Sequence, residues 1–115
     1  MNAAEETAMA RWIDLCAADE LFPGTGACVL IDGQQVALVR VGDDGFYALD
    51  NFDPFAKAFV LSRGIVGDKR GVPMIASPIY KNAFDLRTGQ SLDDPAVRLR
   101  VWPLRLRDGR LEIEW

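Results

Sequence analysis

Two short segments of the chain combine polar side chains with prolines at a spacing that could hold a ligand. The first reads Asn-Phe-Asp-Pro-Phe over residues 51–55, and the second reads Ser-Pro-Ile-Tyr over residues 77–80. The carboxylate of Asp53 could bind a hard cation, but it has no partner at ligand spacing, so we expect no metal site. We expect Asp53 and Ser77 instead to accept hydrogen bonds from backbone N–H groups in tight turns.

The residue types needed for acid–base or nucleophilic catalysis are missing. The chain has no histidine, which removes the usual general base at neutral pH. Ser62 and Ser77 have no base marked by a motif, and the Gly-x-Ser-x-Gly turn of serine hydrolases does not occur. Residues 66–71 contain two glycines but lack the strand–loop–helix setting of a phosphate loop. We therefore expect no catalytic residues in this chain.

The elements that must position the two segments are short strands separated by regular turns, which predicts an all-β fold. Apolar or alternating runs predict strands over residues 11–16, 27–31, 35–41, 46–50, 72–76, 83–86, 99–107 and 110–115. Asp32-Gly33 and Asp108-Gly109 predict two-residue hairpin turns. The apolar residues of the 99–107 run shift from odd to even positions at Trp102-Pro103, so that they would change faces of the strand. This shift predicts a β-bulge there. Pro54 predicts a helical turn within residues 54–60.

Composition predicts one domain over residues 11–115, preceded by a flexible N-terminal segment over residues 1–10. The net charge of -4 and the sequence pI of about 4.7 argue against nucleic acid and membrane surfaces as partners, because both attract basic faces. The acidic start lacks the features of a signal peptide, and no apolar run is long enough to span a bilayer. Cys16 and Cys28 fit free thiols in a reducing compartment, so we expect a cytoplasmic protein.

An ordered set of motifs in residues 50–89 resembles the Rieske iron–sulfur domains. The set consists of Asp50-Asn51-x-Asp53-Pro54-Phe55, Leu61-Ser62-Arg63-Gly64, Ser77-Pro78-x-Tyr80 and Phe84-Asp85-Leu86-Arg87-Thr88-Gly89. The resemblance implies an antiparallel β-sandwich or small barrel, with two adjacent loops at one tip. In that family, cysteines ligate iron at the positions of Asp53 and Ser77, and histidines at those of Phe55 and Tyr80.

The cluster itself is not expected in this chain. A Rieske centre needs two thiolates and two imidazoles, and a chain without histidine cannot supply the imidazoles. Asp53, Phe55, Ser77 and Tyr80 are therefore interpreted as vestigial ligand positions, and no cofactor is expected. We predict that Phe55 and Tyr80 pack across the gap that a cluster would fill, since an empty cavity of that size is costly.

Over residues 11–115 the chain resembles more closely the small subunits of assimilatory NAD(P)H-dependent nitrite reductases, which commonly lack the cluster ligands. This resemblance implies a non-catalytic subunit that binds and supports a large subunit. In such a complex the large subunit carries FAD, siroheme and an iron–sulfur cluster and reduces nitrite to ammonium. Two alternatives stay open: a free-standing binding module of Rieske fold, or a degenerate redox carrier for another oxidoreductase.

Side chains near the two loops could form the surface that docks on such a partner. Phe52, Arg63, Tyr80 and Lys81 are aromatic or basic, and aromatic and arginine side chains dominate interface energetics. The alternative is that Phe55 and Tyr80 only fill the space of the lost cluster and leave Phe52 and the charged residues outside, with the docking surface elsewhere on the domain.

Overall fold

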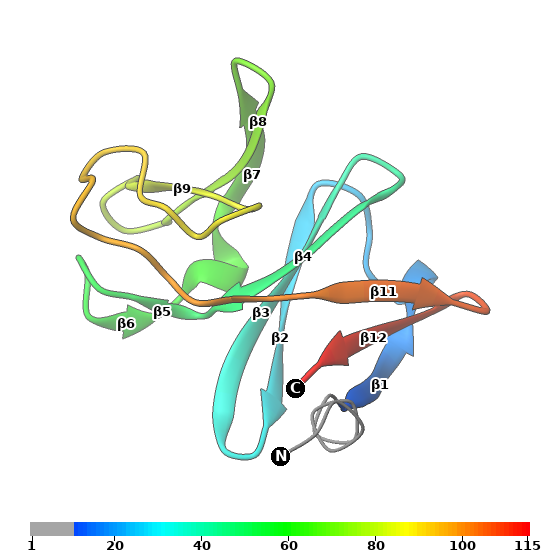
Figure 1. The fold of residues 1–115 in the computed structure, drawn as a ribbon. Helices are drawn as coiled ribbons and strands as arrows, with labels where there is room; N and C mark the ends of the chain where they lie inside the picture. Colours follow the sequence, from blue (N-terminus) through cyan, green and yellow to red (C-terminus); the bar gives the residue numbers. More distant parts are fainter. Residues whose placement is uncertain (1–10) are drawn as a thin grey trace, which may run out of the picture.

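The computed structural model describes residues 11–115 and confirms an all-β fold (Figure 1). The strands are β1 (Trp12–Ala17), β2 (Thr25–Ile31), β3 (Gln34–Val41), β4 (Gly45–Asp50), β5 (Phe52–Asp53), β6 (Ala58–Phe59), β7 (Ile65–Lys69), β8 (Val72–Ala76), β9 (Ala83–Asp85), β10 (Val101–Trp102), β11 (Leu104–Arg107) and β12 (Arg110–Glu114). Two 3-10 turns, η1 (Ala18–Glu20) and η2 (Leu61–Arg63), connect them. The segment 1–10, expected to be flexible, lies outside the described residues.

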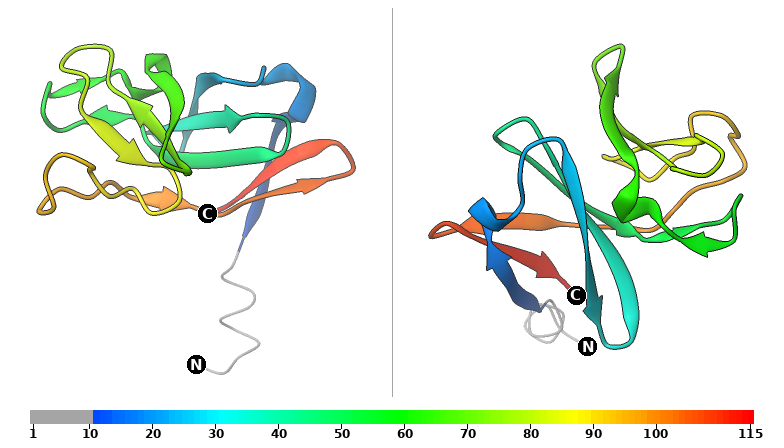
Figure 2. Two further views of the ribbon diagram at one scale, coloured as in Figure 1. Left: turned by 90° about the horizontal axis from the view of Figure 1, so that it is seen from above. Right: turned by 180° about the vertical axis from the view of Figure 1, so that it is seen from behind.

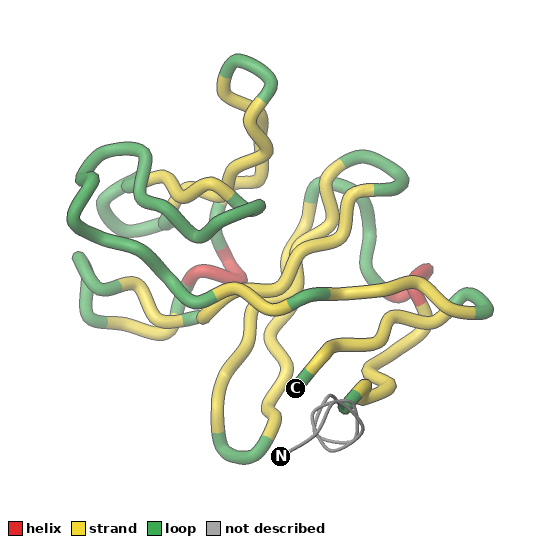
Figure 3. The backbone as a smooth tube through the Cα atoms, viewed as in Figure 1, coloured by secondary structure: helices red, strands yellow, loops and turns green. Residues whose placement is uncertain are grey.

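The strands form antiparallel sheets arranged in two parts (Figures 1 and 2). A base is built from the sheet β10-β4-β3-β2 and the sheet β1-β12-β11. A loop lobe, defined as residues 51–91, carries the hairpin β5-β6 and the sheet β7-β8-β9, and much of it is loop rather than strand (Figure 3). The sheets of residues 11–115 do not close into a barrel, so the predicted sandwich is the form observed. No helix in this part of the chain is long and apolar enough to cross a membrane.

Strand β3 is buried on both faces and separates two hydrophobic cores. Val36 and Leu38 point into the core between the two base sheets, which also contains Ile31, Ala48, Trp102, Leu111 and Ile113. Ala37 and Val39 point into the core under the loop lobe, which also contains Leu49, Leu61, Ile75, Phe84, Leu86 and Leu99. Successive side chains of a strand point to opposite faces, so one strand serves both cores. Strand β3 therefore fixes the loop lobe on the base.

The two predicted Asp-Gly hairpin turns are both present. Asp32 and Gly33 join β2 to β3 with φ values of 49° and 80°, and Asp108 and Gly109 join β11 to β12 with 51° and 76°. Two successive residues with positive φ are the signature of the type I′ turn, whose twist matches that of the flanking strands. These turns set the register of both hairpins.

The prediction of one continuous strand over residues 99–107 is wrong. Val101 and Trp102 pair with β4, whereas residues 104–107 pair with β12, and Pro103 lies between them. A proline has no N–H to donate to a ladder, so the chain leaves one sheet at Pro103 and enters the other. The change of side-chain parity at Trp102-Pro103 is therefore a switch between sheets and not the predicted bulge.

The predicted helical turn over residues 54–60 is also wrong. The chain makes a β-turn after Asp53, pairs again as β6, and forms its 3-10 turn only at residues 61–63. The reason is local, because Lys57 has a φ of 54°, which a right-handed helical turn does not allow. Phe59 then pairs with Phe52 across the hairpin, and a helical turn continued through residue 60 would prevent that pairing.

Gly89 and Gly109 allow a matched test of how tightly the lobe is joined to the base. Both have positive φ (81° and 76°), but a Cβ on Gly89 would overlap the carbonyl oxygen of Leu99, whereas a Cβ on Gly109 would meet open space. We expect Gly89→Ala to lower the free energy of unfolding by at least ~3 kcal/mol, against about 1 kcal/mol for Gly109→Ala. Urea denaturation measures both values, and equal losses would contradict this packing.

Candidate functional site

The loops at residues 51–64 and 77–83 lie side by side, as the sequence predicted, and a buried hydrogen bond joins them. The hydroxyl of Ser77 donates to Oδ2 of Asp53 at 2.5 Å. Both residues are 0% exposed, so the contact is shielded from water. The bond connects the two positions at which the Rieske resemblance places the cysteine ligands.

Each member of this pair also closes its own turn. Oδ1 of Asp53 accepts from the N–H of Phe55 at 2.9 Å, and Oγ of Ser77 accepts from the N–H of Ile79 at 3.3 Å. Both carboxylate oxygens of Asp53 are therefore hydrogen-bonded, as a buried polar group requires. The expected capping role is present for both residues, whereas the bond between them was not foreseen.

The two aromatic residues at the former histidine positions behave differently. Phe55 is half-buried and packs on the core under the lobe, with its ring centroid 6.1 Å from that of Phe84. Tyr80 is 65% exposed, so the prediction that it packs inward is wrong. The turn explains this, because Lys81 has a φ of 64° and its N–H donates to the carbonyl oxygen of Ser77. That tight turn leaves Tyr80 on the outside of the loop.

The residues present do not fit a [2Fe–2S] cluster. Rieske centres use thiolates and imidazoles, whereas these four positions offer a carboxylate, a hydroxyl, a phenyl ring and a phenol. The carboxylate and the hydroxyl already bond to each other, and the phenol group belongs to an exposed side chain. No group of three cysteine, aspartate or glutamate side chains in residues 11–115 is arranged to hold a metal ion.

A second polar layer below the loops ties them to the base. Asn51 is 1% exposed, and its Nδ2 donates to Oε1 of Gln35 on β3 at 2.9 Å. Its Oδ1 accepts from the N–H of Ser62 in η2 at 2.7 Å. Sequence reasoning assigned no role to Asn51 or Gln35, because the three partners are far apart in the chain and form no motif.

The turn after β9 is held by an ion pair within the Phe-Asp-Leu-Arg-Thr-Gly motif. The carboxylate of Asp85 accepts from Nε and Nη2 of Arg87 at 3.2 and 3.1 Å, and from its backbone N–H at 2.9 Å. Hydrogen bonds from the Arg87 side chain hold the pKa of Asp85 below its ordinary value, and they outweigh the burial that raises it. The motif therefore has a structural role in this chain.

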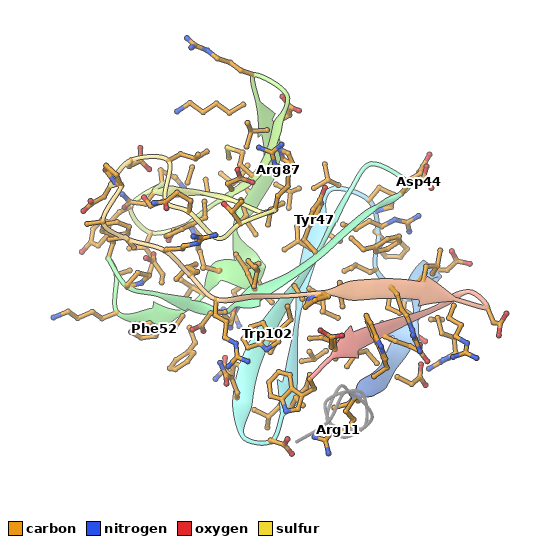
Figure 4. The ribbon with its side chains drawn as sticks, in the orientation of Figure 1. Arg11, Asp44, Tyr47, Phe52, Arg87 and Trp102 are labelled. Atoms are coloured by element: carbon orange, nitrogen blue, oxygen red, sulfur yellow. The ribbon has the colours of Figure 1, made fainter. Side chains whose placement is uncertain are left out.

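The four residues predicted to contact a partner do not form one patch. Tyr80 and Lys81 are neighbours on the exposed 77–83 loop, next to Ile79, which is 46% exposed. Arg63 is exposed on η2. Phe52 lies on the flank of β5 that faces away from β7–β9 (Figure 4), where its ring packs edge-to-face on Phe59 at 5.0 Å. The two phenylalanines line a groove of about 480 Å³ with the β2–β3 hairpin.

The loop lobe carries a net positive charge. Residues 51–91 contain six lysines and arginines against three aspartates, a net charge of +3 in a chain whose total is -4. Asp53 is buried and Asp85 is paired with Arg87. The exposed charges of the lobe are therefore mainly those of Lys57, Arg63, Lys69, Arg70 and Lys81. Such a surface attracts acidic groups.

A family model, known sequences and solved structures match most of this chain. A model of the Rieske-like [2Fe-2S] domain matches residues 11–114. The nitrite reductase (NADH) small subunit of Salmonella typhimurium is 37% identical over 106 residues, which cover 91% of this chain and 98% of that protein. A crystal structure described as an NADH-dependent nitrite reductase small subunit from Mycobacterium tuberculosis is similar with a TM-score of 0.87 and 48% identity, covering 92% of this chain and 96% of that one.

A further relative contains a similar region inside a larger protein. The nitrite reductase [NAD(P)H] large subunit of Klebsiella oxytoca is 38% identical to this chain over 100 residues. That region covers 87% of this chain but 10% of the Klebsiella protein.

Ser77 and Ser62 provide a matched test of the bond between the loops. Ser77→Ala removes the hydroxyl that serves the buried carboxylate of Asp53, so we expect the free energy of unfolding to fall by about 2 kcal/mol. Ser62→Ala should change it by less than about 0.5 kcal/mol, because the Ser62 hydroxyl makes no hydrogen bond within residues 11–115. Chemical denaturation measures the free energy of unfolding of both variants. Similar losses would show that the bond between Ser77 and Asp53 contributes little.

Proposed function

Because the chain belongs to the Rieske-like [2Fe-2S] domain family and, within it, to the nitrite reductase (NADH) small subunits, we propose that it is the non-catalytic small subunit of an NAD(P)H-dependent nitrite reductase. The observation that carries this proposal is the match over 98% of the Salmonella small subunit. The match extends along the whole of that protein and is not confined to the loop motifs.

In this proposal the chain binds and supports a large subunit and does not carry electrons itself. The large subunit holds FAD, siroheme and an iron–sulfur cluster and reduces nitrite to ammonium in nitrate and nitrite assimilation, in the cytoplasm. The Ser77–Asp53 bond supports a role without a cluster, since it joins the two loops that a cluster joins in Rieske proteins. The surfaces of the chain are then its functional parts.

The Klebsiella relative supports a direct association with the large subunit. There, a region similar to this chain and the remainder of the large subunit share one polypeptide. In this chain, residues 11 and 115 lie together, because the N–H of Trp115 donates to the carbonyl oxygen of Arg11 at 2.7 Å. Both residues belong to the β1–β12 side of the base and not to the loop lobe (Figures 1 and 2). A tether at this point would leave the loops free to contact the catalytic body.

We assign the docking surface to the 77–83 loop, with Tyr80 and Lys81 as contact residues; Phe52 and Arg63, the other two candidates, lie apart from this patch. Tyr80 offers an exposed aromatic ring between Ile79 and the ammonium group of Lys81. Aromatic anchors beside basic groups suit a partner surface that combines an apolar pocket with carboxylates. The hydrogen bonds of Asp53 and Ser77 hold both loops in shape before the partner arrives, which reduces the entropy cost of docking.

The first prediction of this proposal concerns iron. The purified chain should be colourless and contain no stoichiometric iron or acid-labile sulfide, because its loops lack the ligands. Asp53→Cys, Phe55→His, Ser77→Cys and Tyr80→His should all be needed before any cluster can form. Metal analysis and visible absorption test this, and about two irons per unmodified chain would favour the redox-carrier alternative.

The second prediction concerns the complex. The chain should bind the purified large subunit, and Tyr80→Ala combined with Lys81→Glu should weaken the affinity tenfold or more, which is about 1.4 kcal/mol. Phe22→Ala with Arg107→Glu is the matched control, since it also removes an exposed aromatic ring and reverses one basic side chain, but outside the loop lobe. Calorimetry measures both affinities, and melting temperatures check folding.

The outcomes of this experiment distinguish a wrong function from a wrong docking surface. If the unmodified chain does not bind the large subunit, the proposed function is wrong. If it binds and both double variants bind equally well, the function stands but the docking surface lies elsewhere.

A further inference from the structure

The base of the domain is open along one seam, between β1 and β2. Strand β1 pairs only with β12, and β2 pairs only with β3, among the described residues. No backbone hydrogen bond between residues 12–17 and 25–31 joins the two strands. On the opposite side the two sheets are connected, because the chain passes from β10 to β11 through Pro103. Two strand edges therefore lack partners at the same seam (Figure 2).

These two edges line one groove. It has a volume of about 770 Å³ and is lined by residues 11–15 of the β1 side and 29–32 of the β2 side. One end is closed where Asp32 accepts hydrogen bonds from Arg11 (3.3 Å) and Trp115 (2.8 Å). At the other end of the seam, beyond the groove, Arg40 donates to the carbonyl oxygen of Leu21 at 2.8 Å and holds the β1–β2 connection. The groove thus has a strand along each of two sides.

The β2 edge has none of the features that usually protect an exposed strand edge. Charged side chains, prolines and bulges normally discourage such an edge from pairing with another chain. Strand β2 reads Thr-Gly-Ala-Cys-Val-Leu-Ile, with no charge and no proline, and it keeps a regular register with β3 along its seven residues. Its Leu30 is 70% exposed.

The other edges of the base are protected. Strand β1 has an irregularity between Asp14 and Cys16, and Asp14 is paired with Arg110. Strand β11, at the far edge of its sheet, carries the charged Arg105 and Arg107. Strand β10, the other edge of the β2 sheet, is two residues long and lies between Arg100 and Pro103. The lack of protection is therefore specific to β2, the strand that faces the groove.

We propose that this seam takes one extended segment of the large subunit, which adds as a strand along β2 and faces β1. This inference rests on the proposed function. Strand addition satisfies unpaired backbone groups and places alternate side chains toward the core between the base sheets. Because strands bound the groove on both sides, the geometry favours a single extended segment. The β2 strand of a second copy would bring its own β3 with it, and β1 leaves no room for that neighbour.

The contacts of the groove define the chemistry of the segment. Val29, Ile31 and Ile13 belong to, or pack against, the core between the base sheets, so inward-facing residues should be small or apolar. Leu30 points out of the other face of β2, where an apolar residue of the segment would cover it. Strand β2 carries no charge, and the charged lining residues are already in ion pairs, Arg11 with Asp32 and Asp14 with Arg110. The segment should therefore be uncharged over about five to seven residues, the usual length of a strand.

The first test compares two exposed leucines on different edges. Leu30→Lys places a charge on the β2 edge, and Leu106→Lys places the same charge on the β11 edge, where the leucine is 57% exposed. With purified large subunit, Leu30→Lys should raise the dissociation constant tenfold or more, whereas Leu106→Lys should change it less than twofold. Melting temperatures of both free variants verify folding. Equal effects of the two changes would overturn the inference.

Hydrogen exchange tests strand addition directly, since a contact through side chains alone would not protect the backbone. In the complex, amides of residues 25–31 that exchange quickly in the free chain should become protected, together with amides of residues 12–17. If a complex forms without protecting them, the seam is not the site, although the proposed function stands. If no complex forms, both proposals fail.

Two further outcomes would assign the groove to another occupant and overturn the inference. Self-association of the free chain that Leu30→Lys abolishes would assign the β2 edge to a second copy. Protection of residues 25–31 already present in the free chain, and lost when residues 1–10 are deleted, would assign the groove to the chain's own first residues.

Discussion

The buried hydrogen bond from Ser77 to Asp53 is the contact on which the loop lobe depends. The pairing of Ile65 with Ala76 already holds the bases of the two loops together, and the bond extends this connection to their turns. Both side chains are fully buried, and each also caps a turn in its own loop. A carboxylate in such a place is stable only while its oxygens have donors, so the two loops must keep this arrangement. Polar side chains thereby join the loops at the positions where Rieske proteins use iron.

The remaining structure holds this pair in place from below. Strand β3 provides the common wall of two cores, and Asn51 links it to η2 through Gln35 and the N–H of Ser62. Gly64 follows η2, where a Cβ would collide with the carbonyl oxygen of Ala76 at the end of β8. The chain therefore keeps the compact backbone of a cluster-binding fold, although the ligand positions hold other residues. That combination is consistent with a domain selected for the shape of its surface.

Much of this architecture could be predicted from the sequence, because its signals are local. The Asp-Gly turns and the strand alternation follow from residues adjacent in the chain, whereas the pairing of the loops at residues 51–64 and 77–83 follows from the resemblance to Rieske domains. The errors arose where distant contacts, or the backbone conformation of a single turn residue, decide the outcome. Pro103 moves the chain between sheets, and the turn at Lys81 directs Tyr80 outward. The hydrogen bonds of Asn51 join three distant segments, and no sequence motif indicates them. The open seam depends on which strand edges remain unpaired, which a list of strands does not reveal.

The proposed function assigns surfaces, and not a redox centre, to this domain. Electron paramagnetic resonance of the reduced large subunit, alone and after assembly with this chain, is the sharpest test of that assignment. We expect the same set of paramagnetic centres in both samples, together with higher nitrite reductase activity or stability in the assembled one. An additional iron–sulfur signal that appears only when this chain is present would show that the domain carries a redox centre after all.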